Sequence, residues 1–372
     1  MTILIFFGVL VLLILVHEFG HFIVAKKSGI RVDEFGIGFP PKLFGKKFGE
    51  TEYTLNLLPI GGFVRIWGED PSDEHYTDGP ESKRSFVKQP KYIQALVLVA
   101  GVSMNILLAY VLYASAYMIG MPTSVGTLEE AQAYNLENVQ LFVSSVNSDT
   151  PASEVLQSSD VLLSLTTEEN TLSSTETLSP EAVSSFISAS EGKEIEAEIL
   201  RRNEQIVVSF TPEQGIIESD PERYAAGFMM TLAGTESYSF FPALLIAGER
   251  TFYSLKAVFF GMFELIGGAF TGSADLSQVS GPVGIVNMVG DAAALGFTWL
   301  LTFSAYISLN LAVINLLPFP ALDGGRLVFV AIESITRKPI KPIIASRLNM
   351  IGFIALLSLM LLVTVYDVMK LL

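Results

Sequence analysis

Four long apolar stretches, at about 1–25, 94–120, 297–320 and 349–368, determine the fold class of this chain. A helix needs about 20 mostly apolar residues to cross the hydrocarbon core of a bilayer, and each stretch meets that length. Half of the 372 residues are hydrophobic and 16% are charged, which is too apolar for an ordinary soluble protein. Basic residues follow the first stretch and none precede it, so we expect a retained helix and not a cleaved signal peptide. The sequence predicts a polytopic α-helical membrane protein with four transmembrane helices.

The distribution of Lys and Arg predicts how these helices are oriented in the lipid bilayer. Residues 26–91 carry 11 Lys and Arg and residues 326–347 carry five, whereas residues 121–238 carry four against 20 Asp and Glu. Basic loops stay in the cytoplasm, so the first two segments are predicted to be cytoplasmic and the third extracytoplasmic. Four spans then place both termini outside. The net charge of −15 comes mainly from the outer segment, and without a basic surface we expect no nucleic-acid partner.

The apolar segment 240–270 leaves two alternatives open. It is long enough to span, but Glu249, Lys256 and Glu264 recur at intervals of seven and eight residues, on one face of a helix. An amphipathic helix of this kind lies along the membrane surface. A span here would also move the basic segment 326–347 outside. We therefore predict interfacial helices and a loop over 240–295.

The segments outside the spans carry strand and turn patterns. Residues 51–70 alternate apolar and polar positions before a Pro-Ile-Gly-Gly turn, which predicts a membrane-associated β-hairpin within the cytoplasmic loop 26–91. Upstream, the Gly-, Pro- and Phe-rich residues 35–49 indicate an irregular loop. Residues 121–238 contain short strand-like runs, a short capped helix at 179–190 and a hairpin around residues 202–203, which predicts one small α+β domain.

Two histidines and a glutamate lie inside the first apolar stretch, where ionisable groups are costly and need a functional reason. His17 and His21 are one helical turn apart, so both imidazoles can reach one metal ion, and Glu18 is beside them as a candidate general base. Two imidazoles and an oxygen ligand suit zinc. His17 precedes Lys26 by nine residues, about 13 Å of helix, which predicts a site within the membrane near its cytoplasmic face.

Asp323 is the candidate third ligand, since a catalytic zinc site usually has three protein ligands. Pro318 and Pro320 break the helix before it, and Gly324 and Gly325 follow it. Broken backbone at membrane depth is tolerated where it is buried in protein or lines a cavity. The alternative is that Asp323 only caps a helix at the membrane interface.

The sequence His-Glu-Phe-Gly-His at 17–21 and the sequence Asn-Leu-Leu-Pro-Phe-Pro-Ala-Leu-Asp-Gly at 315–324 resemble the two signature motifs of the site-2 protease family. The resemblance is nearest to the bacterial regulator-of-sigma-E type of intramembrane zinc protease. It covers nearly the whole chain, because the segments 99–105 and 280–285 also fall in the family's order. It implies a PDZ-like domain at 121–238 and a place in the bacterial inner (cell) membrane.

The resemblance also implies roles for individual residues. It implies a Zn²⁺ cofactor, a catalytic base, and a hairpin that receives unwound substrate as an added strand. The metal ligands would be His17, His21 and Asp323, the base Glu18, and the substrate-binding residues Asn315, Gly61, Gly62 and Phe63.

We therefore predict an intramembrane zinc metalloendopeptidase that cleaves transmembrane segments of single-span membrane proteins. Family resemblance suggests an anti-sigma factor or a remnant signal peptide as substrate, trimmed first by a site-1-type protease. One alternative is a catalytically silent metal-binding scaffold or chaperone, which would have no use for Glu18. Another is a metal transporter, which would need more polar ligands within the membrane than the other spans supply.

Overall fold

The computed structural model describes residues 1–69, 82–134, 136–173, 178–201, 204–217, 219–272 and 280–371. It separates into two compact units, one of residues 1–115 and 244–372 and one of residues 116–243. The first contains the apolar helices and the second most of the strands. We call them the membrane unit and the outer unit.

The described residues include four helices that are long and apolar enough to cross a membrane. They are α1 (Thr2–Lys27), α2 (Lys91–Ile119), α7 (Phe297–Leu316) and α9 (Pro342–Leu371). These match the four predicted stretches, with two changes of boundary. The third helix ends at Leu316 and not at 320, because the prolines that follow cannot continue it, and the fourth begins at Pro342 and not at 349.

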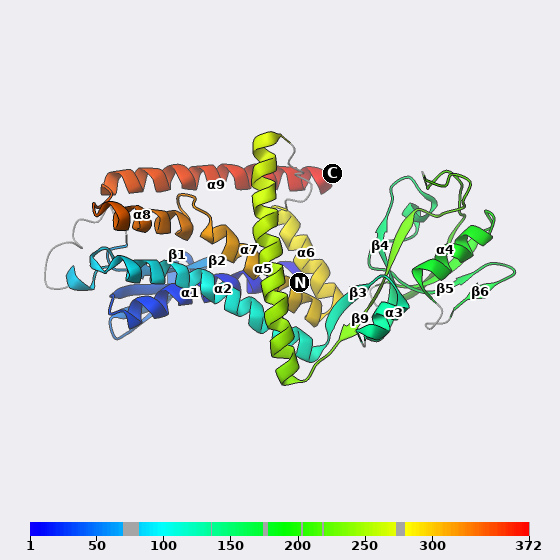
Figure 1. The fold of residues 1–372 in the computed structure, drawn as a ribbon, viewed down its shortest axis with the longest axis horizontal. Helices are drawn as coiled ribbons and strands as arrows, with labels where there is room; N and C mark the ends of the chain where they lie inside the picture. Colours follow the sequence, from blue (N-terminus) through cyan, green and yellow to red (C-terminus); the bar gives the residue numbers. More distant parts are fainter. Residues whose placement is uncertain are drawn as a thin grey trace. The chain divides into compact units, whose positions relative to one another are not determined.

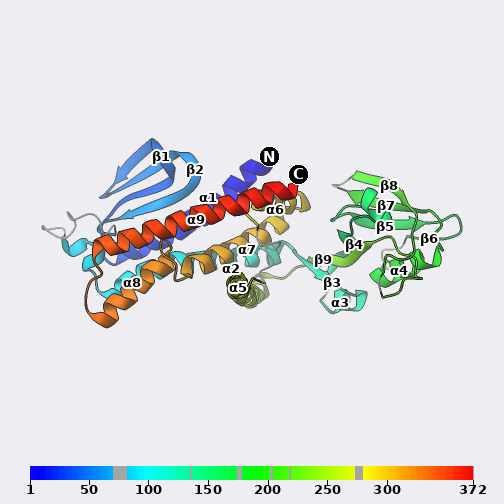
Figure 2. The same cartoon turned by 90° about the horizontal axis from the view of Figure 1, so that it is seen from above.

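Three further helices complete the membrane unit: α5 (Phe240–Thr271), α6 (Pro282–Leu295) and α8 (Asp323–Thr336). Figure 1 shows α5 running across the direction of α1, α2 and α9, and in Figure 2 it is seen end-on while those helices lie lengthwise. The segment 326–347, predicted as a cytoplasmic loop, is helical over most of its length, and its side of the membrane stays a prediction. Residues 326–336 continue α8, whose apolar positions recur at helical spacing.

The prediction of a hairpin formed within residues 51–70 is also wrong, because both halves of this segment pair with an earlier strand that begins at residue 32. Strand β1 (Val32–Phe48) pairs with β2 (Thr51–Ile66), and both fold back on themselves (Figure 2). Residues 34–37 pair with 52–55 on one side and with 62–65 on the other. The two halves of β2 therefore do not pair with each other. The irregular loop expected at 35–49 is part of β1, where the aromatic residues between the glycines supply the side chains that pack.

The sheet is held against α1 by aromatic and ionic contacts. The ring centroid of Phe22 on α1 lies 5.2 Å from that of Phe35 and 6.0 Å from that of Tyr53. At the turn between the strands, Glu50 lies 2.7 Å from the ammonium nitrogen of Lys26 and 2.7 Å from the guanidinium of Arg84. The Lys26 ammonium in particular lowers the pKa of the Glu50 carboxyl. These contacts fix the sheet to the last turn of α1.

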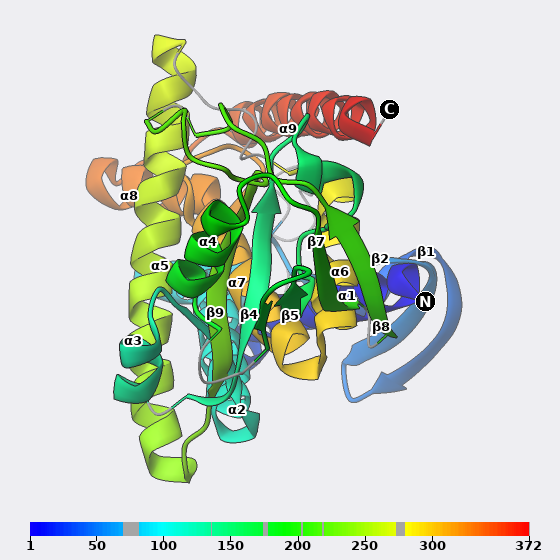
Figure 3. The ribbon, with the colours of Figure 1, turned by 90° about the vertical axis from the view of Figure 1, so that its right-hand side faces the viewer.

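The outer unit is an antiparallel sheet with helices α3 (Leu128–Ala133) and α4 (Pro180–Ala189). The strand order is β3-β9-β4-β5-β7-β8, with β6 paired to β5. The strands are β3 (Met121–Val125), β4 (Glu137–Val146), β5 (Val161–Thr166), β6 (Thr171–Leu172), β7 (Ile195–Arg201), β8 (Glu204–Phe210) and β9 (Phe228–Glu236). Figure 3 shows α4 beside this sheet.

The outer unit has its own apolar core and its own buried ion pair. The core includes fully buried Leu165, Val183 and Ile195. Asp160, 1% exposed, accepts hydrogen bonds from the Arg201 guanidinium at 2.6 and 2.7 Å and from the backbone N–H of Gln157 at 2.8 Å. The predicted hairpin is present as β7 and β8, although its turn residues 202–203 lie outside the described residues.

Candidate metal centre

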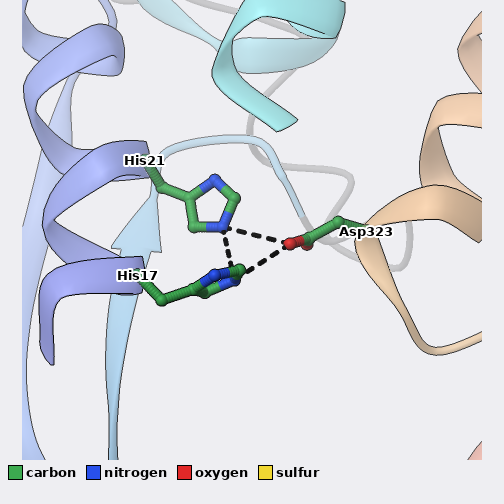
Figure 4. A group of neighbouring side chains, drawn as sticks. All are labelled: His17, His21 and Asp323. Atoms are coloured by element: carbon green, nitrogen blue, oxygen red, sulfur yellow. Dashed lines mark hydrogen bonds and ion pairs between the residues drawn. The ribbon is translucent and has the colours of Figure 1, made fainter. Parts of the chain in front are cut away.

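Three side chains from two distant parts of the chain meet at one point in the membrane unit. His17 Nε2 lies 3.0 Å from Asp323 Oδ2, His21 Nε2 lies 3.3 Å from the same oxygen, and the two Nε2 atoms lie 3.1 Å apart (Figure 4). Both histidines are less than 10% exposed. The three residues predicted as ligands are thus together, and the alternative of a simple helix cap does not explain why the Asp323 carboxylate points at both imidazoles.

The helical turn of α1 and a close approach of α2 position the histidines. His17 and His21 are four residues apart on α1, and their rings meet edge to face with centroids 4.8 Å apart. Gly101 of α2 faces them: a Cβ at this position would lie 2.4 Å from His21 Nε2 and 2.8 Å from His17 Cε1. Only a residue without a side chain leaves room for both imidazoles here.

A tight loop after α7 presents Asp323. The helix ends at Leu316, and Asp323 begins α8 six residues after the α7 C-cap, Leu317. A Cβ on Gly324 would lie 2.2 Å from the carbonyl oxygen of Leu317, so the loop folds directly over the start of α8. Asn349 of α9 accepts a hydrogen bond from the backbone N–H of Ala321 at 3.2 Å. Asp323 is therefore fixed in place by the loop and by α9.

Two residues of α2 contact the Nδ1 atoms of the two imidazoles. His21 Nδ1 donates to the carbonyl oxygen of Val97 at 2.8 Å, which leaves Nε2 free to bind a metal. His17 Nδ1 lies 3.4 Å from the side-chain amide of Asn105, which is fully buried and whose oxygen has no hydrogen-bond partner among the described residues. The backbone carbonyl of Asn105 accepts from Ser308 Oγ at 2.8 Å.

These residues fit a zinc ion. Ligand atoms about 2 Å from a tetrahedral zinc lie about 3.3 Å from one another, close to the 3.0 to 3.3 Å between the three ligand atoms. The orphaned oxygen of Asn105 fits as well. When His17 Nε2 binds a metal, His17 Nδ1 must carry the proton and needs an acceptor. If the Asn105 amide is turned by 180°, its oxygen becomes that acceptor. Two imidazoles and one carboxylate are the donor set of a catalytic and not of a structural zinc site.

The structure also places the other predicted residues. Glu18 is partly buried on α1, and a Cβ on Gly62 would lie 3.8 Å from its Cγ, so the sheet passes beside it. Gly61 is near Ile14, and the Phe63 ring stacks on Phe39 with centroids 6.4 Å apart. Asn315 lies in the last turn of α7, and its side chain makes no hydrogen bond or ion pair within the described residues.

Comparison with known proteins gives the same chemistry. The model of peptidase family M50 matches residues 5–359. The chain belongs to peptidase family M50. Similar proteins include the Clostridium perfringens protein CPE1693, provisionally named a zinc metalloprotease, which is 36% identical over 96% of this chain and 95% of its own length. The regulator of sigma-W protease RasP of Bacillus subtilis is 29% identical over 99% of this chain and 97% of its own.

This M50 peptidase is therefore an integral inner-membrane zinc metalloendopeptidase of the site-2 protease type. The family resemblance, the enzyme class and the zinc cofactor inferred from the sequence are confirmed. One residue at the centre was not singled out from the sequence, namely Asn105. Its signal was present, since an amide within a long apolar helix requires a partner.

Proposed function

We propose that His17, His21 and Asp323 hold the catalytic zinc and that Glu18 is the general base for peptide hydrolysis. The convergence of the three ligand atoms, all within 4.8 Å of one another, carries this proposal. Zinc, when bound, supplies Lewis acidity toward water and the scissile carbonyl. Asn105 and the Val97 carbonyl keep each Nε2 turned toward the metal position.

Glu18 accepts and then donates a proton in this proposal. Its place next to His17 on α1 puts a carboxylate beside the ligand set without making it a ligand. It takes the proton of the attacking water and returns it to the amine that leaves when the C–N bond breaks. A charge is costly at this depth unless it is used or paired, which favours a catalytic role for Glu18 over a packing role.

The substrate is proposed to be a transmembrane segment of a single-span protein. A helix shields its peptide bonds, so the segment must unwind to be cut, and its freed backbone needs hydrogen-bond partners within the membrane. Residues 62–65 pair with 34–37 on one side only, among the described residues, and they pass Glu18 at Gly62. Gly61, Gly62 and Phe63 would thus offer an edge to which substrate adds as a strand, with Asn315 holding it at the end of α7.

The named relatives favour particular substrates. The Bacillus subtilis relative is named a regulator of sigma-W protease, which supports an anti-sigma factor as the substrate, and a remnant signal peptide is the second candidate. In this proposal both termini are extracytoplasmic, the β1–β2 sheet lies at the cytoplasmic membrane surface, and α5 and α6 lie at the outer interface. The outer unit is a PDZ-like domain that limits access to proteins already trimmed by another protease.

Cleavage by purified wild type and by Glu18→Gln, reconstituted with a single-span model protein, tests this proposal. We expect wild type to cut, the variant to lose at least about 100-fold in rate, and both to hold one zinc per chain, because the amide cannot accept a proton. Asn310→Leu is the control variant and should cut normally, because this half-buried amide on α7 bonds only the Tyr306 carbonyl of its own helix among the described residues.

The outcomes separate the alternatives. If both proteins hold zinc and neither cuts any of several substrates, the scaffold hypothesis replaces the protease. If zinc crosses the vesicle membrane in proportion to protein, the transporter hypothesis replaces it. If neither protein binds zinc, the ligand assignment is wrong.

A further inference from the structure

A cavity lined by both charged and apolar side chains lies in the membrane unit, beside the loop that carries Asp323. It has a volume of about 530 Å³ and lies where α2 begins and where α8 is followed by α9. None of the three metal ligands lines it. Its volume is in the range of sites that bind small molecules.

The charges of this cavity are unequal once its ion pairs are counted. Four cations and two carboxylates line it. Lys91 pairs with Glu333 at 2.6 Å, and Arg326 pairs with Glu69. Lys88 and Lys341 make no ion pair among the described residues. Both acids are thus neutralised, and two ammonium groups are left facing the same cavity, which favours an anion.

The rest of the lining is apolar. Phe86, Leu98, Val330 and Ala345 are all less than 10% exposed and form part of the cavity wall. The wall continues into α9, whose membrane-spanning window is only 6% buried. A ligand here contacts both cations and apolar side chains, beside an exposed apolar helix.

The position and charge select one class of ligand. Lys91 begins α2 and Lys341 precedes α9, so the cavity is at the ends of two spans, on the side that the positive-inside rule assigns to the cytoplasm. The cytoplasmic flank of a substrate helix would itself be rich in Lys and Arg by the same rule, and the unpaired lysines would repel it. Anionic phospholipids are abundant at this surface, and basic pockets between transmembrane helices bind their headgroups.

We propose that this cavity is a binding site for an anionic phospholipid. Lys88 and Lys341 contact the phosphate of the headgroup, and the acyl chains lie along α9. The three proposed metal ligands do not line this cavity, although Asn349 lines it and also bonds the loop that carries Asp323.

Native mass spectrometry of the full chain, extracted from nanodiscs of phosphatidylglycerol and phosphatidylcholine in equal amounts, tests the proposal. Wild type should retain phosphatidylglycerol in preference to phosphatidylcholine. The double variant Lys88→Ala/Lys341→Ala should lose that preference by about 10- to 30-fold, because each lysine near the surface contributes about a tenfold factor or somewhat less.

The matched control is Lys46→Ala/Lys338→Ala. It removes two exposed lysines from the same predicted face, neither of which lines the cavity. This control should keep the preference. Equal losses in the two double variants would show a general effect of surface charge and would overturn the site, as would an unchanged preference in Lys88→Ala/Lys341→Ala.

Two competitors identify the occupant. Soluble glycerol phosphate should displace the lipid poorly, since it lacks the acyl chains, and complete displacement would mean a site for free phosphate instead. A peptide with the basic cytoplasmic flank of a single-span protein should not displace it. Displacement by that peptide would assign the cavity to substrate and overturn the lipid proposal.

Discussion

The membrane unit and the outer unit bury polar groups in different ways. In the outer unit, the Asp160 carboxylate is fully buried, yet Arg201 and the Gln157 N–H satisfy it within the domain. In the membrane unit, His17, His21 and Asp323 point their ligand atoms at one another, and the oxygen of the neighbouring Asn105 lacks a partner. The outer polar cluster is complete without a ligand, whereas the inner one would be completed by a metal ion. Changes in the two clusters should therefore have separable effects.

The largest expected effect comes from removing one ligand of the inner cluster. Asp323→Ala should weaken zinc binding on the order of 100- to 1,000-fold, since it removes one of three ligands, and should abolish cleavage. Zinc content by atomic absorption and cleavage of a single-span protein measure this. Hydrogen exchange in residues 121–238 should not change. Zinc retained at one per chain would contradict the ligand assignment.

Breaking the outer cluster should destabilise the outer unit and leave zinc binding unchanged. Asp160→Ala leaves the Arg201 guanidinium without its partner, and we expect the outer unit to lose about 3 kcal/mol of stability. Hydrogen exchange of β5 and β7 measures this loss, with zinc content as the second reading, which should stay at wild-type level. Lys193→Ala breaks only the exposed pair with Glu169 and should change stability by less than about 0.5 kcal/mol. A similar loss in both variants would mean that burial is not what gives Asp160 its importance.

Asn105→Leu tests whether the inner cluster extends beyond the ligands. Loss of the acceptor for His17 Nδ1–H should lower zinc affinity about 10- to 100-fold. Asn105→Asp keeps an acceptor oxygen and should recover most of the affinity. Competition with a zinc chelator gives both values. If leucine and aspartate behave alike, Asn105 serves packing and does not orient the histidine.

The smallest effect is expected at Ser159 in the outer unit. Its φ of 76° lies in the left-handed region, which is unfavourable for a residue with a side chain. Ser159→Gly removes this backbone strain but increases the conformational entropy of the unfolded chain. We therefore expect the free energy of unfolding to rise by about 0.5 kcal/mol. Ser158→Gly, without a positive φ, should gain nothing. Equal hydrogen exchange in the two variants would contradict the strain.

The sequence predicted those parts of the protein that depend on local periodicity. The four spans follow from length and hydropathy, and the pairing of His17 with His21 follows from the helical repeat. Asp323 was reached because few other polar residues lie in the spans. The sequence also predicted the helix that begins at Pro180 after the Ser179 cap, whose hydroxyl accepts from the N–H of Ala182 at 3.1 Å.

The parts that were not predicted depend on contacts between distant segments. Strand β1 was missed because its Gly and Pro residues indicate a loop when taken alone. Its strand state depends on pairing with both halves of β2 and on Phe22 of α1. Asn105 was not assigned a role because its partners, His17 and Ser308, are 88 and 203 residues away. No local pattern indicates such a contact.

His17 and Asp323 are 306 positions apart, and on the proposed ligand assignment this separation determines when the metal site is first complete. A ribosome adding 5 to 20 residues per second needs about 15 to 60 s to travel between the two codons. Until α8 has emerged, α1 carries two ligands and a base without the third ligand. On the proposed ligand assignment, the nascent chain therefore has no complete zinc site while its first helices are being inserted. Activity then begins only when nearly the whole chain has been synthesised.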